Sequence, residues 1–192
     1  MAKYLPQILI GVAVAFVVSL LLAVVAGPGP EGPVLGAMMG AFTAYILANL
    51  AGNRKVAAAS AAEREAALSF QPPEGKALAY LYREGFVAKA AGMNLSVDGR
   101  EVVQLKSPRF TRLVLSPGRH VLVAGFGGLA GAQSKPATYD LDAKAGEVTI
   151  LKIGAAMGLV QGNITITPAD DLAAAKTRLS GMTMIAAEPA EA

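Results

Sequence analysis

The sequence predicts a membrane α-helical hairpin of two transmembrane helices, followed by a mainly antiparallel β-sandwich domain with a short C-terminal helix. Three observations predict this fold class. Two uncharged apolar runs lie near the N-terminus, at residues 8–26 and 33–51. From residue 75 onward, short runs of β-forming residues alternate with turn residues. An amphipathic segment that ends at Gly181 follows the last of these runs.

The two apolar runs have the length of membrane-spanning helices. Each holds about 19 residues, which rise roughly 28 Å as an α-helix and match the hydrocarbon core of a bilayer. The connection at residues 27–32 is short and rich in Pro and Gly, which end a helix. Residues 1–52 are therefore expected to form an antiparallel hairpin. A cleavable signal peptide is the alternative for the first run.

Small residues recur at every fourth position of both runs. This spacing places each set on one face of its helix, where small side chains let two backbones approach closely in lipid. The stripes are expected to mediate helix packing, either within one hairpin or between copies of the chain. The residues are Gly11, Ala15, Ser19 and Ala23 in the first run, and Gly36, Gly40, Ala44 and Ala48 in the second.

The charges that flank the runs predict the sidedness of the hairpin. Lys3 precedes the first run, Arg54 and Lys55 follow the second, and Glu31 is the charge of the connecting loop. The positive-inside rule then places both termini and the β domain in the cytoplasm, with the loop outside. A domain on the opposite side is the alternative.

Residues 53–74 are expected to link the hairpin to the β domain. The segment 53–68 is rich in Ala, Glu and Arg, which favour helix, and it holds neither Gly nor Pro. We expect the second helix to continue through it as a juxtamembrane stalk. A Pro-rich linker then stops the helix at residues 70–75.

The β domain is predicted over residues 75–180. Asp98-Gly99 is a strong hairpin turn, because both residues tolerate positive φ. The last helix is expected to begin at Thr167 and Pro168, and residues 181–192 form a tail. Eight strands are predicted, at residues 77–82, 94–97, 101–105, 110–115, 119–126, 138–141, 147–153 and 163–167.

Several turn motifs resemble an uncharacterised bacterial domain family that is similar to PEGA and transthyretin-like β-sandwiches. The motifs are residues 75–83, 97–100, 115–120 and the glycine-rich 154–162, and the resemblance covers residues 75–179. Many members are envelope lipoproteins, whereas this sequence has no Cys for lipid attachment and has two apolar runs instead. The resemblance implies a bacterial envelope protein with a periplasmic domain, and it supplies no catalytic residues. The two apolar runs predict instead a bacterial inner-membrane protein, with the periplasmic domain as the alternative.

Composition disfavours most cofactor chemistry. The 192 residues include no Cys and one His, which argues against disulfides, thiolate metal sites and haem. His120 lacks a nucleophile motif, and residues 125–130 match a GxGxxA pattern without a helical pattern behind it, so we expect a flexible loop there. The net charge of +3 is too small to indicate nucleic-acid binding. We expect no cofactor, no metal and no small-molecule substrate.

Six basic residues are candidates for contact with anionic lipid or an acidic partner protein. The alternative is an ordinary solvated edge, since edge strands often carry charge. The residues are Arg54, Lys55, Lys106, Arg109, Arg112 and Arg119.

Taken together, these features favour a non-enzymatic membrane protein. The expected function is an accessory or assembly subunit of a larger bacterial membrane complex, for example a bioenergetic or transport complex. Its partners would be membrane lipids and other subunits. One alternative is a self-assembling homo-oligomer whose copies meet through their small-residue stripes. The other, an envelope module that binds glycan or lipid, follows only from the family resemblance.

Overall fold

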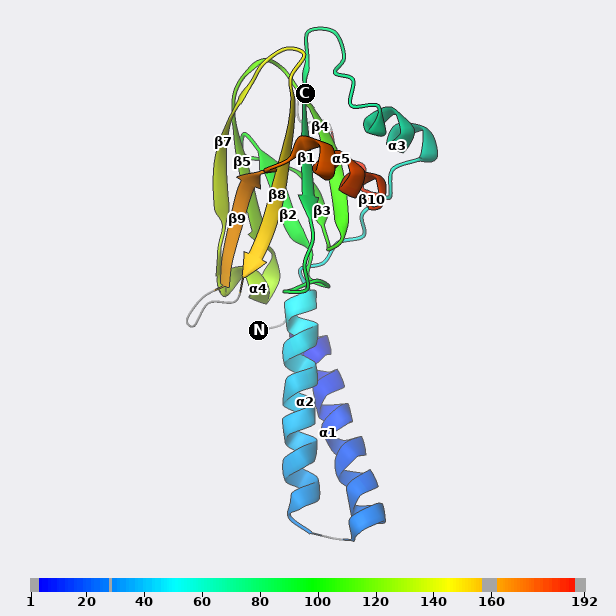
Figure 1. The fold of residues 1–192 in the computed structure, drawn as a ribbon. Helices are drawn as coiled ribbons and strands as arrows, with labels where there is room; N and C mark the ends of the chain where they lie inside the picture. Colours follow the sequence, from blue (N-terminus) through cyan, green and yellow to red (C-terminus); the bar gives the residue numbers. More distant parts are fainter. Residues whose placement is uncertain (1–3, 28, 157–161, 189–192) are drawn as a thin grey trace. The chain divides into compact units, whose positions relative to one another are not determined.

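A computed structural model describes residues 4–27, 29–156 and 162–188. The chain divides into two compact units, Met1–Gly52 and Asn53–Ala192. The first unit is helical and the second is rich in strands (Figure 1). Each unit is described by itself.

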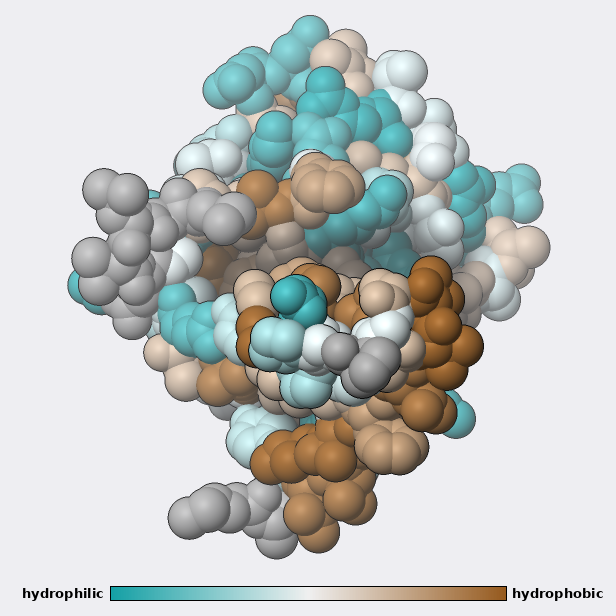
Figure 2. All heavy atoms as spheres, turned by 90° about the horizontal axis from the view of Figure 1, so that it is seen from below, coloured by the Kyte–Doolittle hydropathy of each residue, from teal (hydrophilic) through white to brown (hydrophobic). Residues whose placement is uncertain are grey.

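The first unit is a pair of antiparallel helices, α1 (Leu5–Ala26) and α2 (Glu31–Leu50). Gly27 ends α1 at a φ of +85°, which glycine adopts without strain. Both helices are long and apolar enough to cross a membrane. Their large apolar side chains point outward, and hydrophobic residues lie at the surface in the end-on view of Figure 2. This pattern suits helices surrounded by lipid.

The second unit contains two sheets, ordered β10-β4-β1-β8-β9-β6 and β3-β2-β5-β7. Most neighbouring strands are antiparallel, while β1–β8, β4–β10 and β6–β9 are parallel. The strands are β1 (Ala77–Arg83), β2 (Met93–Val97), β3 (Arg100–Leu105), β4 (Arg109–Leu115), β5 (Gly118–Phe126), β6 (Ser134–Lys135), β7 (Ala137–Ala143), β8 (Val148–Ala156), β9 (Gly162–Pro168) and β10 (Thr183–Met184).

All eight predicted strands are present, with ends that differ by a few residues at most. Asp98 and Gly99 form the expected turn between β2 and β3, with φ of +51° and +84°. Two short strands, β6 and β10, were not predicted. Part of the glycine-rich motif, residues 157–161, lies outside the described residues.

Strand β1 is the centre of the unit, and every one of its residues is buried. Ala77, Ala79 and Leu81 lie in a hydrophobic cluster that both sheets share. The alternate residues Leu78 and Tyr80 lie in a second cluster beneath helices α3 (Ala61–Leu68) and α5 (Leu172–Ser180). The domain therefore holds one core to which both sheets contribute and another that the larger sheet shares with these helices.

The expected helical stalk at residues 53–68 is not formed. Helix α2 ends at Leu50, and α3 is a separate helix that begins after Ser60. Ser60 and Glu63 form a capping box, in which each side chain bonds the backbone N–H of the other residue. The hydroxyl of Tyr80 donates to the carbonyl of Ala67 over 2.5 Å, and burial raises the pKa of that hydroxyl to about 12. These residues belong to the β domain.

The C-terminal helix begins later than the sequence predicts. Strand β9 continues to Pro168, which pairs with Leu151, and Asp171 caps α5 through the amides of Ala173 and Ala174. Pairing with β8 therefore overrides the local helix-start signal at Thr167 and Pro168. Gly181 ends the helix as expected.

The predicted tail is part of the domain over residues 181–188. Strand β10 pairs with β4, and Met184 and Ile185 are buried. The Ile185 amide donates to Phe110 O at 2.8 Å, and the Thr111 hydroxyl donates to Ile185 O at 2.9 Å. The segment also pairs with Ala58, so two stretches expected outside the domain complete it together.

We expect Ile185→Ala to destabilise the β domain by about 2–5 kcal/mol, because it removes buried methylene groups and leaves a cavity. The matched control is Leu172→Ala, since Leu172 is 51% exposed. Urea unfolding of the full chain in detergent, followed by tyrosine fluorescence, measures both. Equal midpoints for the two variants would show that the segment around β10 is not part of the cooperative unit.

Candidate functional site

The small-residue stripes of α1 and α2 face each other within the hairpin. A Cβ added to Gly11 would lie 2.7 Å from Gly40 O and 2.8 Å from the Cβ of Ala44. One added to Gly36 would clash with the Ser19 hydroxyl and with Ala15 O. Glycine is therefore required at these positions, because the helix backbones are almost in contact.

The contact between the helices continues towards the loop through Ser19 rather than Ala23. The Ser19 hydroxyl donates to Ala15 O at 2.8 Å and lies 3.2 Å from Gly32 O on the other helix. Ala23 is exposed. Near the loop, Gly32 on α2 instead faces Leu22, the residue before Ala23.

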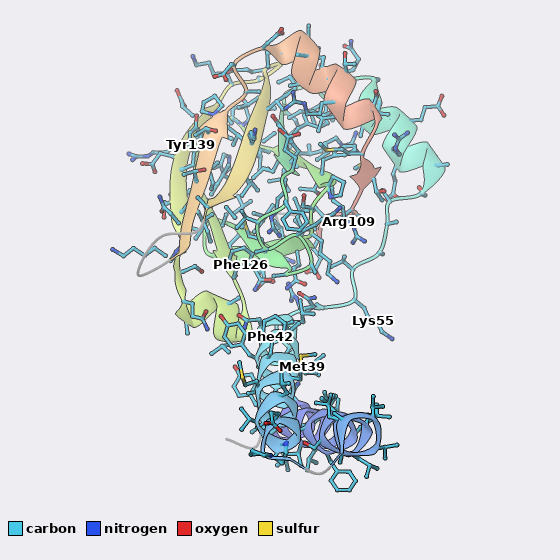
Figure 3. The ribbon with its side chains drawn as sticks, turned by 60° about the horizontal axis from the view of Figure 1, so that its bottom comes forward. Met39, Phe42, Lys55, Arg109, Phe126 and Tyr139 are labelled. Atoms are coloured by element: carbon cyan, nitrogen blue, oxygen red, sulfur yellow. The ribbon has the colours of Figure 1, made fainter. Side chains whose placement is uncertain are left out.

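The six candidate basic residues do not form one patch. Arg54 pairs with Glu101 on β3, and Arg119 pairs with Asp140 at 3.3 Å on β7, at the opposite edge of the same sheet. Arg109 is the first residue of β4 and Arg119 is the second residue of β5, so the length of β4, roughly 20 Å, lies between them along the chain path. The charge of Arg112 favours the ionised forms of Glu63 and Tyr80. Lys55 is exposed and extends outward (Figure 3).

Arg83, at the end of β1, organises the loop at residues 84–92. It is 1% exposed, and its guanidinium lies 5.1 Å from the ring centre of Phe126, which Figure 3 labels. Burial lowers its pKa to about 10, which still leaves it charged at neutral pH. Its N–H groups donate to four backbone carbonyls, those of Val87, Ala88, Ala91 and Leu105.

Asn53 ties the start of the second unit to the same loop. Its side-chain amide donates to Ala90 O at 3.0 Å, and its carbonyl accepts from the Gly92 amide at 2.6 Å. The next amide, of Arg54, donates to the Gln104 side chain at 2.7 Å. Sequence reasoning missed this clamp, because it joins residues that are 37 and 39 positions apart.

Glu84 joins the larger sheet to α5. It pairs with Lys152 at 2.9 Å and with Arg178 at 2.7 Å. Partial burial opposes ionisation, but the hydrogen bond and charge of Lys152 and those of Arg178 outweigh it and lower the pKa of Glu84. Lys152 and Arg178 also line a hollow of about 180 Å³ with Asp170 and Asp171. Its charges are mixed, so it does not favour a ligand of one sign.

His120 and the GxGxxA segment have structural roles. His120 lies 2.7 Å from the Asp98 carboxylate and 2.9 Å from Ser116 O. The hydrogen bond from the Val121 amide lowers the pKa of Asp98, and the hydrogen bond with His120 lowers it further. In place of the expected flexible loop, Gly128–Ala132 forms the one-turn helix α4. Within the part of the chain that the structure describes, no cluster of acidic or His side chains could hold a metal ion.

The fold and the site define a two-helix apolar hairpin joined to a domain of two sheets. No protein-family model matches the chain, and no curated protein matches it. Among solved structures, the chain is similar to an NMR structure of a protein from Eubacterium rectale, with 11% identity and a TM-score of 0.32. The match covers 50% of this chain and 92% of that one. A likeness this weak carries no argument, so the resemblance to PEGA and transthyretin-like domains stays a prediction.

We expect the double variant Leu22→Cys with Gly32→Cys to form a disulfide within one chain. A Cβ at position 32 lies 3.6 Å from that of Leu22, which is within the range that a disulfide spans. The control pairs Gly32→Cys with Leu21→Cys, since Leu21 points outward and is 58% exposed. Mild oxidation followed by non-reducing electrophoresis measures the result. Efficient cross-linking into dimers instead would contradict packing within the hairpin.

Proposed function

We propose that this chain is a non-enzymatic accessory or assembly subunit of a larger bacterial membrane complex. In this proposal the hairpin anchors the chain in the inner membrane. The two-sheet domain, which we interpret as a β-sandwich, binds partner subunits. The observation that carries the proposal is that the hairpin uses its small-residue stripes internally. Gly36 and Gly40 already face Ala15 and Gly11.

This internal packing argues against the competing self-assembly hypothesis. That hypothesis needs the glycine face of α2 to meet another copy of the chain, and the same face cannot serve both contacts. What remains for other proteins or for lipid is the outer surface of the helices. Phe16 and Phe42 there are 69% and 60% exposed.

The polar groups of the β domain also support a scaffold rather than a catalyst. The most deeply buried charge, on Arg83, is bonded to backbone carbonyls. His120 holds a turn by bonding Asp98 and Ser116 O. Both side chains stabilise the chain's own loops, whereas a catalytic group is aimed at the place where a substrate would react.

The experiment that tests the proposal is native purification of the full chain in mild detergent, with mass determination of what co-purifies. We expect a stoichiometric set of other membrane proteins. The control is the same purification after a wash in harsh detergent, which should release them. A single species at a multiple of 19.6 kDa would contradict the proposal and favour self-assembly.

The predicted sidedness is tested with cysteines at two exposed positions, since the chain has no Cys of its own. Glu31 lies at the start of α2 next to the loop, and Ala145 lies in the β7–β8 turn. With an impermeant reagent on intact cells, whose outer membrane is first made permeable, we expect Glu31→Cys to react and Ala145→Cys to be protected. Lysis should expose both. The reverse pattern would place the β domain in the periplasm, and equal reaction of both would exclude a spanning hairpin.

A further inference from the structure

The loop at residues 85–91 exposes an aromatic side chain to an unusual degree. Phe86 is 88% exposed, more than any other large hydrophobic side chain among the described residues. Exposing so much apolar surface to water is unfavourable by roughly 25 cal/mol per Å² relative to burial. Such a residue on an ordered loop points to a contact that covers it.

The loop is ordered by an extensive set of hydrogen bonds. Every backbone carbonyl from residue 85 to residue 91 accepts a hydrogen bond from the protein itself. Three of these carbonyls accept from Arg83, two accept from Ser107, and one accepts from Asn53. The Lys89 amide supplies the last by donating to Phe86 O at 3.1 Å.

Because each of these carbonyls is already hydrogen-bonded within the protein, none of them would lose a hydrogen bond if the loop left the aqueous phase. Irregular backbone is excluded from lipid because its unpaired polar groups would lose their hydrogen bonds to water. Here the carbonyls do not depend on water. The charge of Arg83 is likewise buried behind the loop rather than presented at its surface. The carbonyls of the loop therefore do not oppose its approach to an apolar phase.

The residue that clamps this loop comes shortly after α2 in the sequence. Asn53 bonds to both Ala90 and Gly92, and it follows Leu50 by three positions. Three residues of extended chain reach about 11 Å at most. If α2 spans a bilayer, the residue that clamps the loop therefore lies at the membrane interface.

The charges around the loop suit the same location. Lys89 is exposed within the loop, and Lys55 is exposed two residues beyond Asn53. Basic residues near a membrane surface are attracted to anionic headgroups, each by about 1 kcal/mol. Lysine can also extend its ammonium to the headgroups while its stem lies along apolar groups. Elements that lie in the membrane interface commonly combine Lys or Arg with Trp, Phe or Leu.

From these observations we propose that the loop at residues 85–91 is a lipid-contacting element, in which Phe86 inserts into the interfacial layer of the membrane that the hairpin crosses. Lys89 and Lys55 would contact anionic headgroups beside it. The loop would thus give the β domain a second membrane contact, in addition to its covalent tether. This inference rests on the membrane anchoring proposed above.

The test uses tryptophan as a reporter, because the chain contains none. Three single variants of the full chain are reconstituted into vesicles of zwitterionic and anionic phospholipid with brominated acyl chains, which quench nearby tryptophan. Phe86→Trp reports on the loop, and Phe16→Trp reports on the exposed face of α1. Val121→Trp is the matched control, because Val121 is 37% exposed and bonds Asp98, at the opposite end of β2 from the loop.

We expect Phe16→Trp and Phe86→Trp to lose most of their emission in brominated vesicles relative to unbrominated ones, and Val121→Trp to lose little. Quenching of Phe16→Trp without quenching of Phe86→Trp would overturn the loop proposal and leave the anchor standing. An unquenched Phe16→Trp would overturn the anchoring itself and this inference with it. If Phe86→Trp is unquenched in vesicles but shielded from iodide in native membranes, the loop binds a protein instead of lipid.

Discussion

The burial of strand β1 on both faces is the constraint on which the rest of the domain depends. One face lies in the core that the two sheets share, and the other lies beneath α3 and α5. Because both faces of β1 are covered, its last residue, Arg83, is buried as well, and the charge of Arg83 needs hydrogen-bond partners within the protein. Because four carbonyls rather than water surround that guanidinium, one side chain determines the path of the loop that follows.

Patterns within a few residues predicted most of the elements, and contacts between distant residues account for the errors. The eight strands and the Asp98-Gly99 turn were readable because alternation and turn chemistry are local. The prediction of a helical stalk was wrong, because the capping box at Ser60 and the pairing of Ala58 with Ile185 override the helix propensity of residues 53–68. The small-residue stripes were visible, but their partner was not, since spacing alone cannot tell one chain from two. The bonds of Asn53 join residues 37 and 39 positions apart, and the carbonyls that Arg83 bonds, 4 to 22 positions away, follow no regular pattern.

The two units use polar groups in the same way. In the hairpin, the Ser19 hydroxyl bonds backbone carbonyls of both helices. In the domain, Arg83 bonds backbone carbonyls of the irregular loop after β1, and Thr111 bonds the carbonyl of Ile185 just beyond β10. In each case a side chain replaces the solvent that the backbone would otherwise need. Both units thus hold their own backbone in place with side chains, and the hairpin presents large apolar side chains outward, in keeping with the anchored subunit proposed above.

The parallel pairing of β10 with β4 has a consequence for how the chain is made. Thr111 and Ile185 are 74 positions apart, and the residues of β1, β8 and β9 are all synthesised before Ile185. Until then, one edge of β4 is open, and an open edge is a site for wrong pairing with other chains. The apolar hairpin is synthesised first and can enter a membrane while that edge is still open. Early insertion would keep each nascent domain tethered and apart from its neighbours during the interval in which it is most prone to aggregate.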